Sequence, residues 1–369
     1  MSLAPEQVAG PSSESPTGWK GFLTERLGLG VLAALSAKKR VPVHRTTAFY
    51  FLGGLALFLF TIQIVSGVLL SLYYKPSPAQ AFESVQSIMT EIDFGWLIRS
   101  VHAWGANLVI GALFLHLFTA FVMRAYRRPR ELTWCSGVLI LALFLVFGFS
   151  GYLLPWDQLS FFATRVGTAL VGVFPVLGHD LLLLTRGGED VTGDTLSRFY
   201  ALHVAILPLA TLGMLGLHLF LVQQHGMSIP ERAVERAGGK DKVPSIPFVP
   251  DFLLRDAVGW YLALAVLAAL AALFPWELGE KADPFGSAPD GIKPEWYFLF
   301  MFQTLKKLPA HIMGLEGEML GGLFFGCCGL VILVVPFLDR GERSRRVLTG
   351  LAAVAVAFIL VMTIWGVLE

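Results

Sequence analysis

Seven long apolar stretches alternate with short polar segments along the chain. Each stretch reaches the ~20 residues that an α-helix needs to cross the hydrocarbon core of a bilayer. The stretches are Thr46–Tyr74, Ser100–Met123, Leu132–Trp156, Phe199–Gln224, Ala257–Trp276, Met319–Leu338 and Val347–Leu368. The pattern predicts an all-α integral membrane protein with seven transmembrane helices.

Other apolar segments are too short to span a membrane. Val166–Gly178 contains Pro175 and predicts a surface or re-entrant helix, and Trp296–Leu305 is shorter still. Residues 1–45 hold a tail rich in proline and serine, followed by Trp19–Lys39, which predicts an amphipathic helix at the membrane interface.

The composition excludes several classes of protein. Hydrophobic residues make up 55% of the chain and charged residues 15%, whereas charge is about a quarter of a soluble protein. The formal net charge of +1 gives no basic excess for binding nucleic acid. Cys135, Cys327 and Cys328 form no CxxC pair, which argues against disulfide frameworks, zinc ribbons and cysteine-ligated clusters.

The distribution of charge predicts the orientation. The N-terminal segment and the second, fourth and sixth loops hold 19 Lys and Arg residues, against 9 in the other loops. By the positive-inside rule the first set faces the cytoplasm. The N-terminus is therefore expected in the cytoplasm and the C-terminus outside, where 15 acidic residues lie in the outer loops.

Four histidines lie inside the second and fourth stretches. His102 and His116 are 14 residues apart, and His203 and His218 are 15 apart. At about 100° per residue, each pair lies on one face of its helix, with roughly 21 Å of helix axis between its members. The two helices are separated by one crossing and run in the same direction. His102 should therefore lie level with His203 at the outer side, and His116 with His218 at the inner side.

Two facing imidazoles at each level favour haem. An ionisable side chain inside a membrane helix is costly and often marks a functional site. We find no hydroxyl, carboxylate or thiol beside either pair, so a zinc or di-iron site would lack protein ligands. Haem iron needs only two axial ligands. One buried histidine bonded to a neighbouring helix would be ordinary, but that does not explain four in register.

Glycines and arginines fit the same interpretation. The glycines that match the histidine spacing are Gly53 and Gly67 in the first stretch and Gly137 and Gly151 in the third. Missing side chains at these levels would admit a flat macrocycle, although small residues also allow helices to pack closely. Arg99 and Arg198 precede the outer histidines and could neutralise haem propionates or simply extend to the interface.

A short motif in the loop before the sixth stretch suggests a quinone site. Pro294-Glu295-Trp296-Tyr297 puts a carboxylate beside two aromatic rings. A glutamate there could accept a proton from a reduced quinone while the aromatic rings form an apolar slot.

With this motif the chain resembles the cytochrome b subunit of the quinol:cytochrome c and plastoquinol:plastocyanin oxidoreductases. The resemblance runs from about Gly18 to the C-terminus. The segments that carry it are Phe94-Gly95-Trp96-Leu97-Ile98-Arg99-Ser100-Val101-His102, Gly151-Tyr152-Leu153-Leu154-Pro155-Trp156-Asp157-Gln158, Leu196-Ser197-Arg198-Phe199-Tyr200-Ala201-Leu202-His203 and Ile292-Lys293-Pro294-Glu295-Trp296-Tyr297-Phe298.

The resemblance also implies a domain organisation. Residues 1–45 would be a cytoplasmic tail and interfacial helix, 46–226 a four-helix di-haem cytochrome b domain, 227–256 a cytoplasmic linker, and 257–369 a three-helix domain carrying the quinol-site loop. The spacing in the fourth stretch is similar to the chloroplast-type protein, which is normally two chains. Here the subunit-IV-like part is joined to the first part in one polypeptide.

The resemblance implies a Q-cycle with two haem b groups, the outer on His102 and His203 and the inner on His116 and His218. Quinol oxidised outside would give one electron to a Rieske iron–sulfur protein and one through both haems to an inner quinone, contributing to a proton gradient. A Rieske protein, a c-type cytochrome, lipid and a second copy of the chain are the expected partners, in a bacterial cytoplasmic membrane. No nucleic acid partner is expected.

The resemblance assigns roles at the two quinone sites. Glu295 is the expected outer proton acceptor, Tyr297 shapes or hydrogen-bonds that pocket, and Pro294 and Trp296 line it. Asp256 is the expected inner proton donor, although an acidic residue there would also suit the start of a helix.

Three further positions surround the expected inner site. Arg255 or His225 would assist Asp256, and Gln223 stands where the family usually has Arg or His. His225 could take over proton delivery or be an ordinary interfacial histidine.

One departure concerns a third haem. Chloroplast-type proteins tether it to a cysteine in the first helix, but this chain has Phe51 after Phe49 and Tyr50. A thioether at that position is impossible. Cys135 could substitute in principle, although it also suits the role of a small buried apolar residue.

Two other functions are compatible with buried histidines. A proton-relaying transporter would predict inverted repeats and broken helices, which the sequence does not show. A di-haem anchor of a dehydrogenase would need neither the Pro-Glu-Trp-Tyr segment nor three helices after the fourth.

Overall fold

A computed structural model of the chain describes residues 19, 26, 39–289 and 291–369. The predicted tail and interfacial helix fall almost entirely outside these residues. Within the described part, seven helices are long and apolar enough to cross a membrane. The predicted all-α fold and the predicted number of spans are therefore confirmed.

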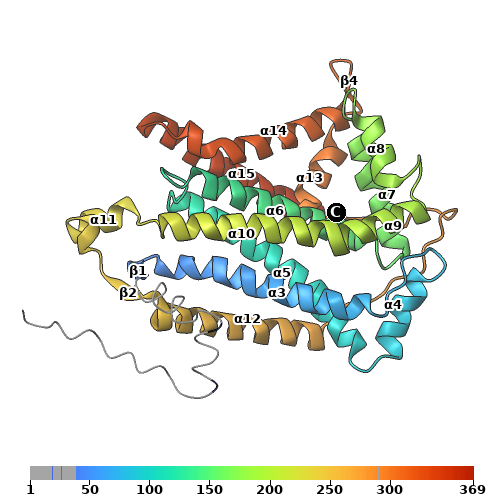
Figure 1. Cartoon of the computed structure of the whole chain (residues 1–369). Coiled ribbons are helices and arrows are strands. Elements are labelled where there is room, and N and C mark those ends of the chain that lie inside the picture. Colours follow the sequence, from blue (N-terminus) through green and yellow to red (C-terminus); the bar gives the residue numbers. More distant parts are fainter. Residues whose placement is uncertain (1–18, 20–25, 27–38, 290) are drawn as a thin grey trace, which may run out of the picture.

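The spanning helices lie side by side with roughly parallel axes (Figure 1). Three of them join consecutive elements without a loop, since η1 (Thr47–Tyr50) and α3 form the first span, α9, η2 and α10 the fourth, and η4 and α12 the fifth. The bounds are α3 (Phe51–Ser71), α5 (Gly95–Val122), α6 (Glu131–Tyr152), α9 (Gly193–Ala201), η2 (Leu202–Ile206), α10 (Leu207–His225), η4 (Phe248–Phe252), α12 (Leu253–Leu273), α14 (Gly317–Leu338) and α15 (Glu342–Leu368).

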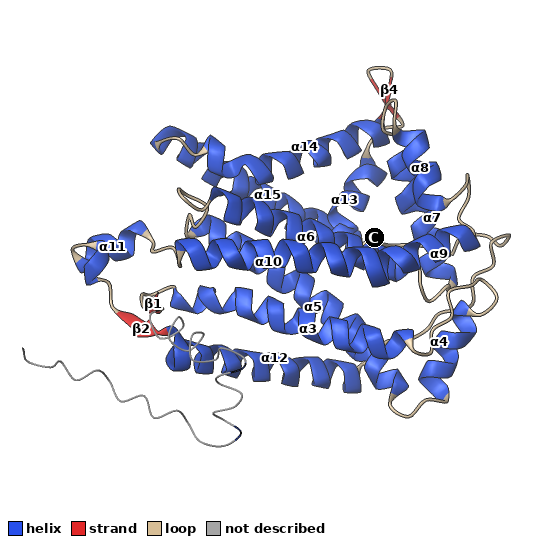
Figure 2. Ribbon diagram, in the orientation of Figure 1, coloured by secondary structure: helices blue, strands red, loops and turns tan. Residues whose placement is uncertain are grey.

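Shorter elements gather at the two ends of this bundle (Figures 1 and 2). At one, which we call the α11 end, lie β1 (Arg40–Pro42), η1 (Thr47–Tyr50), α11 (Glu231–Ala237), η3 (Lys240–Lys242) and β2 (Ser245–Pro247). At the other, the α4 end, lie α4 (Ala81–Thr90), α7 (Gln158–Gly172), α8 (Gly178–Arg186) and the hairpin of β3 (His311–Ile312) and β4 (Leu315–Glu316). Between α12 and α14 the chain forms the short helix α13 (Trp296–Lys307).

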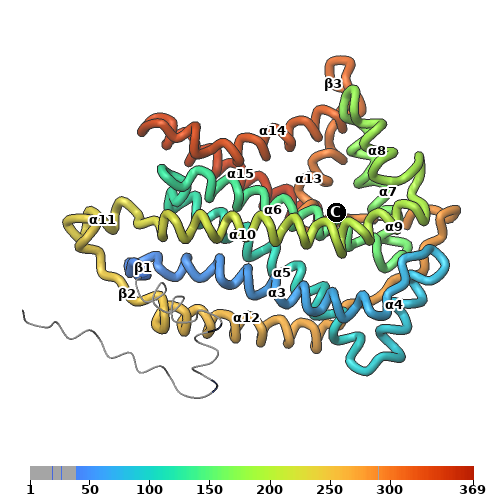
Figure 3. The backbone as a smooth tube through the Cα atoms, in the orientation of Figure 1, coloured from blue at the N-terminus to red at the C-terminus, as the bar shows by residue number. Residues whose placement is uncertain are grey.

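Two strands join distant parts of the chain at the α11 end. β1 pairs antiparallel with β2, and Val41 lies opposite Ile246. The backbone in Figure 3 passes from α10 through α11 and β2 into α12, so this pairing brings the starts of α3 and α12 together. Phe51 and Phe252 stack there, with ring centroids 4.8 Å apart.

The segment predicted as one short helix over Val166–Gly178 forms parts of two. α7 starts earlier, because Asp157 and Ser160 form a reciprocal capping box at its N-terminus. Pro175 lies in the turn between α7 and α8, where its lack of an N–H ends the first helix.

A network of charged side chains ties the C-terminal helices to the bundle at the α11 end. The Asp339 side chain is 1% exposed. Its Oδ2 accepts hydrogen bonds from the Tyr126 hydroxyl at 3.0 Å and from Arg127 Nε and Nη2, both at 3.2 Å. Arg127 also contacts Glu231 of α11. Burial, together with the Asp339 charge, raises the pKa of Tyr126 to about 12, so the phenol stays protonated and donates.

Replacing Asp339 with asparagine should destabilise the protein. The change removes the negative charge of the carboxylate that accepts these three hydrogen bonds. A hydrogen bond to a charged group contributes about 1.5–3 kcal/mol at most. We expect a loss of about 1–3 kcal/mol, seen as a lower unfolding temperature of the purified protein in detergent. Glu342→Gln, which alters an exposed carboxylate at the start of α15, is the control, and equal unfolding temperatures for the two variants would contradict this.

Candidate functional site

The structure brings His102 and His203 together. Their ring centroids are 6.2 Å apart and the ring planes make an angle of 72°. His116 and His218 lie further along the same helices, toward the α11 end. They are close enough for the charge of one to affect the other. The four histidines thus form two cross-helix pairs between α5 and the η2–α10 span.

A π-helical turn explains why the two histidine spacings differ. His203 lies in η2 (Leu202–Ile206), where the helix carries about one more residue per turn than an α-helix. Pro208 follows within the next turn and lacks the N–H that an α-helical bond would need. The π turn absorbs the extra residue, so 15 residues in the fourth span cover the same rotation as 14 in α5.

Three serines contact the histidines, which corrects the expectation that no hydroxyl lies beside them. Nδ1 lies 2.9 Å from a serine Oγ in His102–Ser66 and His218–Ser136, and 3.2 Å in His203–Ser150. Each serine hydroxyl also donates to a backbone carbonyl of its own helix. Because a hydroxyl has only one proton, the imidazole Nδ1–H must be the donor to Oγ. The Nε2 lone pair is then free to bind a metal.

His116 differs from the other three. Its Nδ1 is buried and has no hydrogen-bond partner within the described ranges. The residue that precedes its matching glycine is Leu52, whereas Ser66, Ser136 and Ser150 each precede one. The repeated Ser-Gly pair was therefore a readable signal for the serine contacts.

Each predicted glycine faces one imidazole. A Cβ built on Gly53 would lie 3.3 Å from His116 Cε1, and one on Gly67 would lie 3.2 Å from His102 Cε1. On α6 the corresponding distances are 3.3 Å from Gly137 to His218 and 2.6 Å from Gly151 to His203. Larger residues at these positions would displace the rings, so the glycines set where the imidazoles lie.

These donors fit haem. Imidazole nitrogens bind a metal at about 2.0–2.1 Å, which puts the centroids of two facing rings roughly 6 Å apart, as His102 and His203 are. In the part of the chain that the structure describes, no three His, Cys, Asp or Glu side chains form a metal-binding group. Two imidazoles per level therefore match an iron whose remaining ligands come from a porphyrin.

The two arginines before the outer histidines bind backbone carbonyls in this structure. Arg99 is buried and donates to the carbonyls of Trp276 and Glu277 after α12. Arg198 donates to the carbonyls of Leu183 and Leu184 near the end of α8. Arg99 therefore fastens the segment after α12 to the bundle, and Arg198 fastens the end of α8 to it.

Glu295 and Tyr297 lie beside Tyr152. Glu295 precedes the first residue of α13, and burial raises the pKa of its carboxyl above the ordinary value. Burial and the nearby Glu295 charge raise the pKa of Tyr297, so its phenol stays protonated. The Tyr297 ring packs against Gly148 of α6, where a Cβ would lie 2.9 Å from Cζ. This cluster is a carboxyl that can hold a proton, flanked by two phenols.

Trp296 is anchored to α5 by a residue that the sequence did not single out. Its indole Nε1 donates to Asn107 Oδ1 at 2.8 Å, and its ring lies 6.2 Å from that of Phe114. Pro294 is half-buried just before it. Asn107 lies between the two histidine levels of α5, so this bond connects the motif to the helix that carries His102 and His116.

Asp256 lies at the α11 end, against α3. Its side chain is buried and a Cβ built on Gly54 would overlap the carboxylate. Asp256 Oδ1 has no hydrogen-bond partner among the described residues. A buried carboxyl oxygen without a partner is costly and marks the position as a functional candidate.

The other residues predicted near Asp256 have varied environments. Arg255 and Gln223 are exposed. His225 ends α10, half-buried, and its Nδ1 has no partner among the residues described. Arg130, which sequence reasoning missed, donates to the carbonyls of His225, Gly226 and Met227 and fixes the end of α10.

Phe51 and Cys135 both have ordinary packing. Phe51 stacks on Phe252, as described above, and Cys135 Sγ lies 3.5 Å from the Leu333 carbonyl oxygen. Cys328 is half-buried and Cys327 is exposed. All three cysteines are free.

Two family descriptions match the chain. "Cytochrome b/b6/petB" matches residues 37–226, and "Cytochrome b(C-terminal)/b6/petD" matches residues 281–369. The first covers the histidine pairs and the second covers the Pro-Glu-Trp-Tyr segment.

Individual relatives agree with this match. The cytochrome bc complex cytochrome b subunit of Chlorobaculum thiosulfatiphilum is 47% identical over 88% of this chain and 75% of its own length. Cytochrome b6 of Heliobacterium mobile is 46% identical over 57% of this chain and 99% of its own. A solved chain described as "Hyperthermophilic respiratory Complex III" superposes with a TM-score of 0.82 at 35% identity, covering 94% of this chain and 90% of that one. The chain therefore belongs to the cytochrome b family, as a cytochrome b subunit of a bc-type complex with b6-like and subunit-IV-like parts in one polypeptide.

Proposed function

We propose that this subunit carries the quinone sites of a quinol:cytochrome c oxidoreductase, or of one with a plastocyanin-like acceptor, working by a Q-cycle. One observation carries the proposal: two histidine pairs at two depths, with Nε2 free, between carboxyl groups at opposite ends of the bundle. The C-terminal family match at 281–369 favours this over a dehydrogenase anchor, which would not need those helices.

The proposed cofactors are two haem b groups. His102 and His203 would hold the outer one and His116 and His218 the inner one. When bound, the haems supply one-electron carriers at two depths of the membrane, which a Q-cycle needs for one of the two electrons of each quinol. The serines keep Nδ1 protonated at three ligands, which aims Nε2 at the iron.

The outer site is proposed around Glu295. Its carboxylate would accept a proton from the quinol hydroxyl, and the Tyr297 and Tyr152 phenols beside it would hydrogen-bond the ring oxygens. Trp296, held by Asn107, and Pro294 would form the apolar wall.

The inner site is proposed around Asp256. The Asp256 carboxyl, whose Oδ1 has no hydrogen-bond partner among the described residues, would deliver a proton to the reduced quinone, and His225 would relay protons from the aqueous side. Arg255 would assist Asp256 by its charge, and Arg255 and Gln223 would hydrogen-bond the quinone. Since the first span has Phe51 where chloroplast-type proteins have a cysteine, no third haem would be tethered there through a thioether.

The remaining proposals concern assembly and orientation. A relative that is named a cytochrome bc complex subunit supports a Rieske protein and a c-type cytochrome as partners. A second copy of the chain within the complex is proposed from the family resemblance alone. The excess of Lys and Arg in the loops of the α11 end supports an orientation with that end in the cytoplasm of a bacterial cell and the C-terminus outside.

Replacing His218 with leucine should reduce the haem content from two b-type groups per chain to one, because the inner iron loses an axial ligand. A pyridine haemochrome assay of the purified protein measures this. His179→Gln, at an exposed histidine outside the spans, should keep both. Two retained haems with unchanged axial spectra in His218→Leu would contradict the proposed ligation.

Glu295→Gln should slow quinol oxidation by about 10²-fold or more with both haems retained, because general base catalysis contributes about 10²–10⁴-fold. In the unaltered protein the base must be ionised, so the rate should fall as pH drops through the raised pKa of Glu295. In Glu295→Gln the rate should no longer fall as the pH drops through this range. Glu277→Gln, exposed in the same loop, is the control, and an unchanged rate in Glu295→Gln would refute the assignment.

Asp256→Asn should impair proton uptake at the inner side. In proteoliposomes turning over quinol, we expect the uptake rate to fall about 10²-fold, since the amide cannot deliver a proton. Asp251→Asn, at an exposed carboxylate in η4, should leave it unchanged. Normal uptake in Asp256→Asn would place the inner donor elsewhere.

A further inference from the structure

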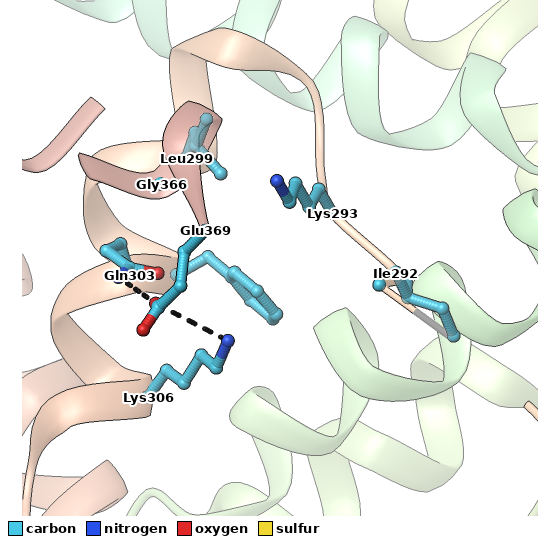
Figure 4. Close-up of a pocket in the computed structure, with 9 residues that line it drawn as sticks. Ile292, Lys293, Leu299, Gln303, Lys306, Gly366 and Glu369 are labelled. Carbon is cyan, nitrogen blue, oxygen red and sulfur yellow. Dashed lines mark hydrogen bonds and ion pairs between the residues drawn. The ribbon is translucent and has the colours of Figure 1, made fainter. Parts of the chain in front are cut away.

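The last residues of α15 are fastened to the segment that carries Glu295. Lys293 Nζ donates to the Val367 carbonyl at 3.2 Å. Gln303 Nε2 donates to Glu369 Oε2 at 2.5 Å, and Lys306 Nζ lies 3.5 Å from the same oxygen. Figure 4 shows the Glu369 carboxylate between the side chains of Gln303 and Lys306.

Packing adds to these polar contacts. Gly366 of α15 lies against Leu299 of α13, which is buried, and a Cβ built on Gly366 would be 2.8 Å from Leu299 Cγ. Lys307 Nζ lies 5.0 Å from the centroid of the Trp365 ring, a cation–π distance, and also contacts Glu369. Any side chain at Gly366 must therefore displace Leu299.

The contacts differ in strength. The ion pairs to Glu369 are partly exposed, and such pairs contribute little alone. Gln303 is only 2% exposed, so its amide depends on Glu369 as an acceptor. Hydrogen bonds from Gln303 and Lys307 lower the pKa of Glu369 to about 2, so the carboxylate is charged at any working pH and its contribution is lost only as pH falls toward 2. The amide bond and the Gly366 contact thus matter most.

The loop before α13 depends on these contacts because a cavity lies beneath it. The cavity has a volume of about 240 Å³ and is lined by residues of all three segments, the loop, α13 and the end of α15. Lys293 and Ile292 of the loop border this space, as Figure 4 shows. On this side the loop borders the cavity, so it is held by its contacts with α15 and not by dense packing.

These contacts bracket the outer site in the sequence. Lys293 is two residues before Glu295, and Leu299 is two residues after Tyr297. We propose that the end of α15, through Gly366, Val367 and Glu369, positions Glu295 and Tyr297 for quinol. This inference rests on the proposed role of Glu295. The three α15 residues act through α13 and its loop, and are positioning residues.

The test uses the assembled complex with Gly366→Leu and Glu369→Gln. Both should keep two haem b groups and unchanged haem spectra. Displacing a catalytic group by a fraction of an ångström to one ångström costs up to about 10²-fold, and we expect KM for quinol to rise about three- to tenfold. The pH at which the rate is half-maximal should also shift, because the surroundings of Glu295 change. Glu369→Asp should restore part of the loss, and Glu342→Gln, at the opposite end of α15, should change nothing.

The outcomes separate this inference from the proposed function. Should Glu295→Gln slow oxidation while Gly366→Leu and Glu369→Gln keep the KM and pH profile of the unaltered complex, the positioning role is wrong and the proposed function stands. Should Glu295→Gln also have no effect, both fail. If Gly366→Leu does not assemble, Gly366→Ala, which meets the same Leu299 contact, is measured in its place by the same criteria.

Discussion

An imidazole inside a membrane helix is the constraint on which this structure depends. Both ring nitrogens need a partner, because hydrocarbon offers none. At His102, His203 and His218 a serine oxygen accepts the Nδ1 proton, so Nε2 carries a lone pair. Without a second partner for Nε2, burying four such rings would be costly. The glycines beside them and the π turn at His203 are arrangements that bring the rings to matched depths.

The rest of the bundle fastens that core at each end. At the α4 end, Arg99 binds carbonyls of the segment after α12, Arg198 binds carbonyls at the end of α8, and Trp296 binds Asn107 on the histidine-bearing α5. At the α11 end, Arg130 holds the end of α10 and Asp339 connects the last two helices to the turn after α5. Pairing a buried charge with a carbonyl group or with an opposite charge offsets the cost of removing that charge from water. The same contact also holds the loop in place. Glu295 and Asp256, the carboxyl groups to which a proton-transfer role is assigned, have no such partner among the described residues.

Most of the fold was predictable from the sequence, because seven apolar stretches leave few alternatives in a membrane. The family was identified from motifs, and the comparisons confirm it. Local chemistry was harder. The serine contacts were missed because a serine in an apolar helix usually bonds to its own backbone, and a second role depends on which helix lies opposite. The break between α7 and α8 lies at Pro175, although the apolar run over Val166–Gly178 suggested one helix. The bonds of Arg99 and Asn107 link residues more than 150 positions apart, and no local pattern encodes them.

Joining the two family parts in one chain has a physical consequence for the outer site. Helix α13 does not span the membrane. Its depth is therefore fixed neither by lipid contacts along a full span nor by packing along one. Its position comes from neighbours in both parts: α5 and α6, which receive Trp296 and Tyr297, and α15, which receives Leu299 and Gln303. The Asp339 network fixes the other end of the last two helices to the turn after α5. Helix α15 is thus held at both ends, and a shift of either end would reach Glu295 through α13.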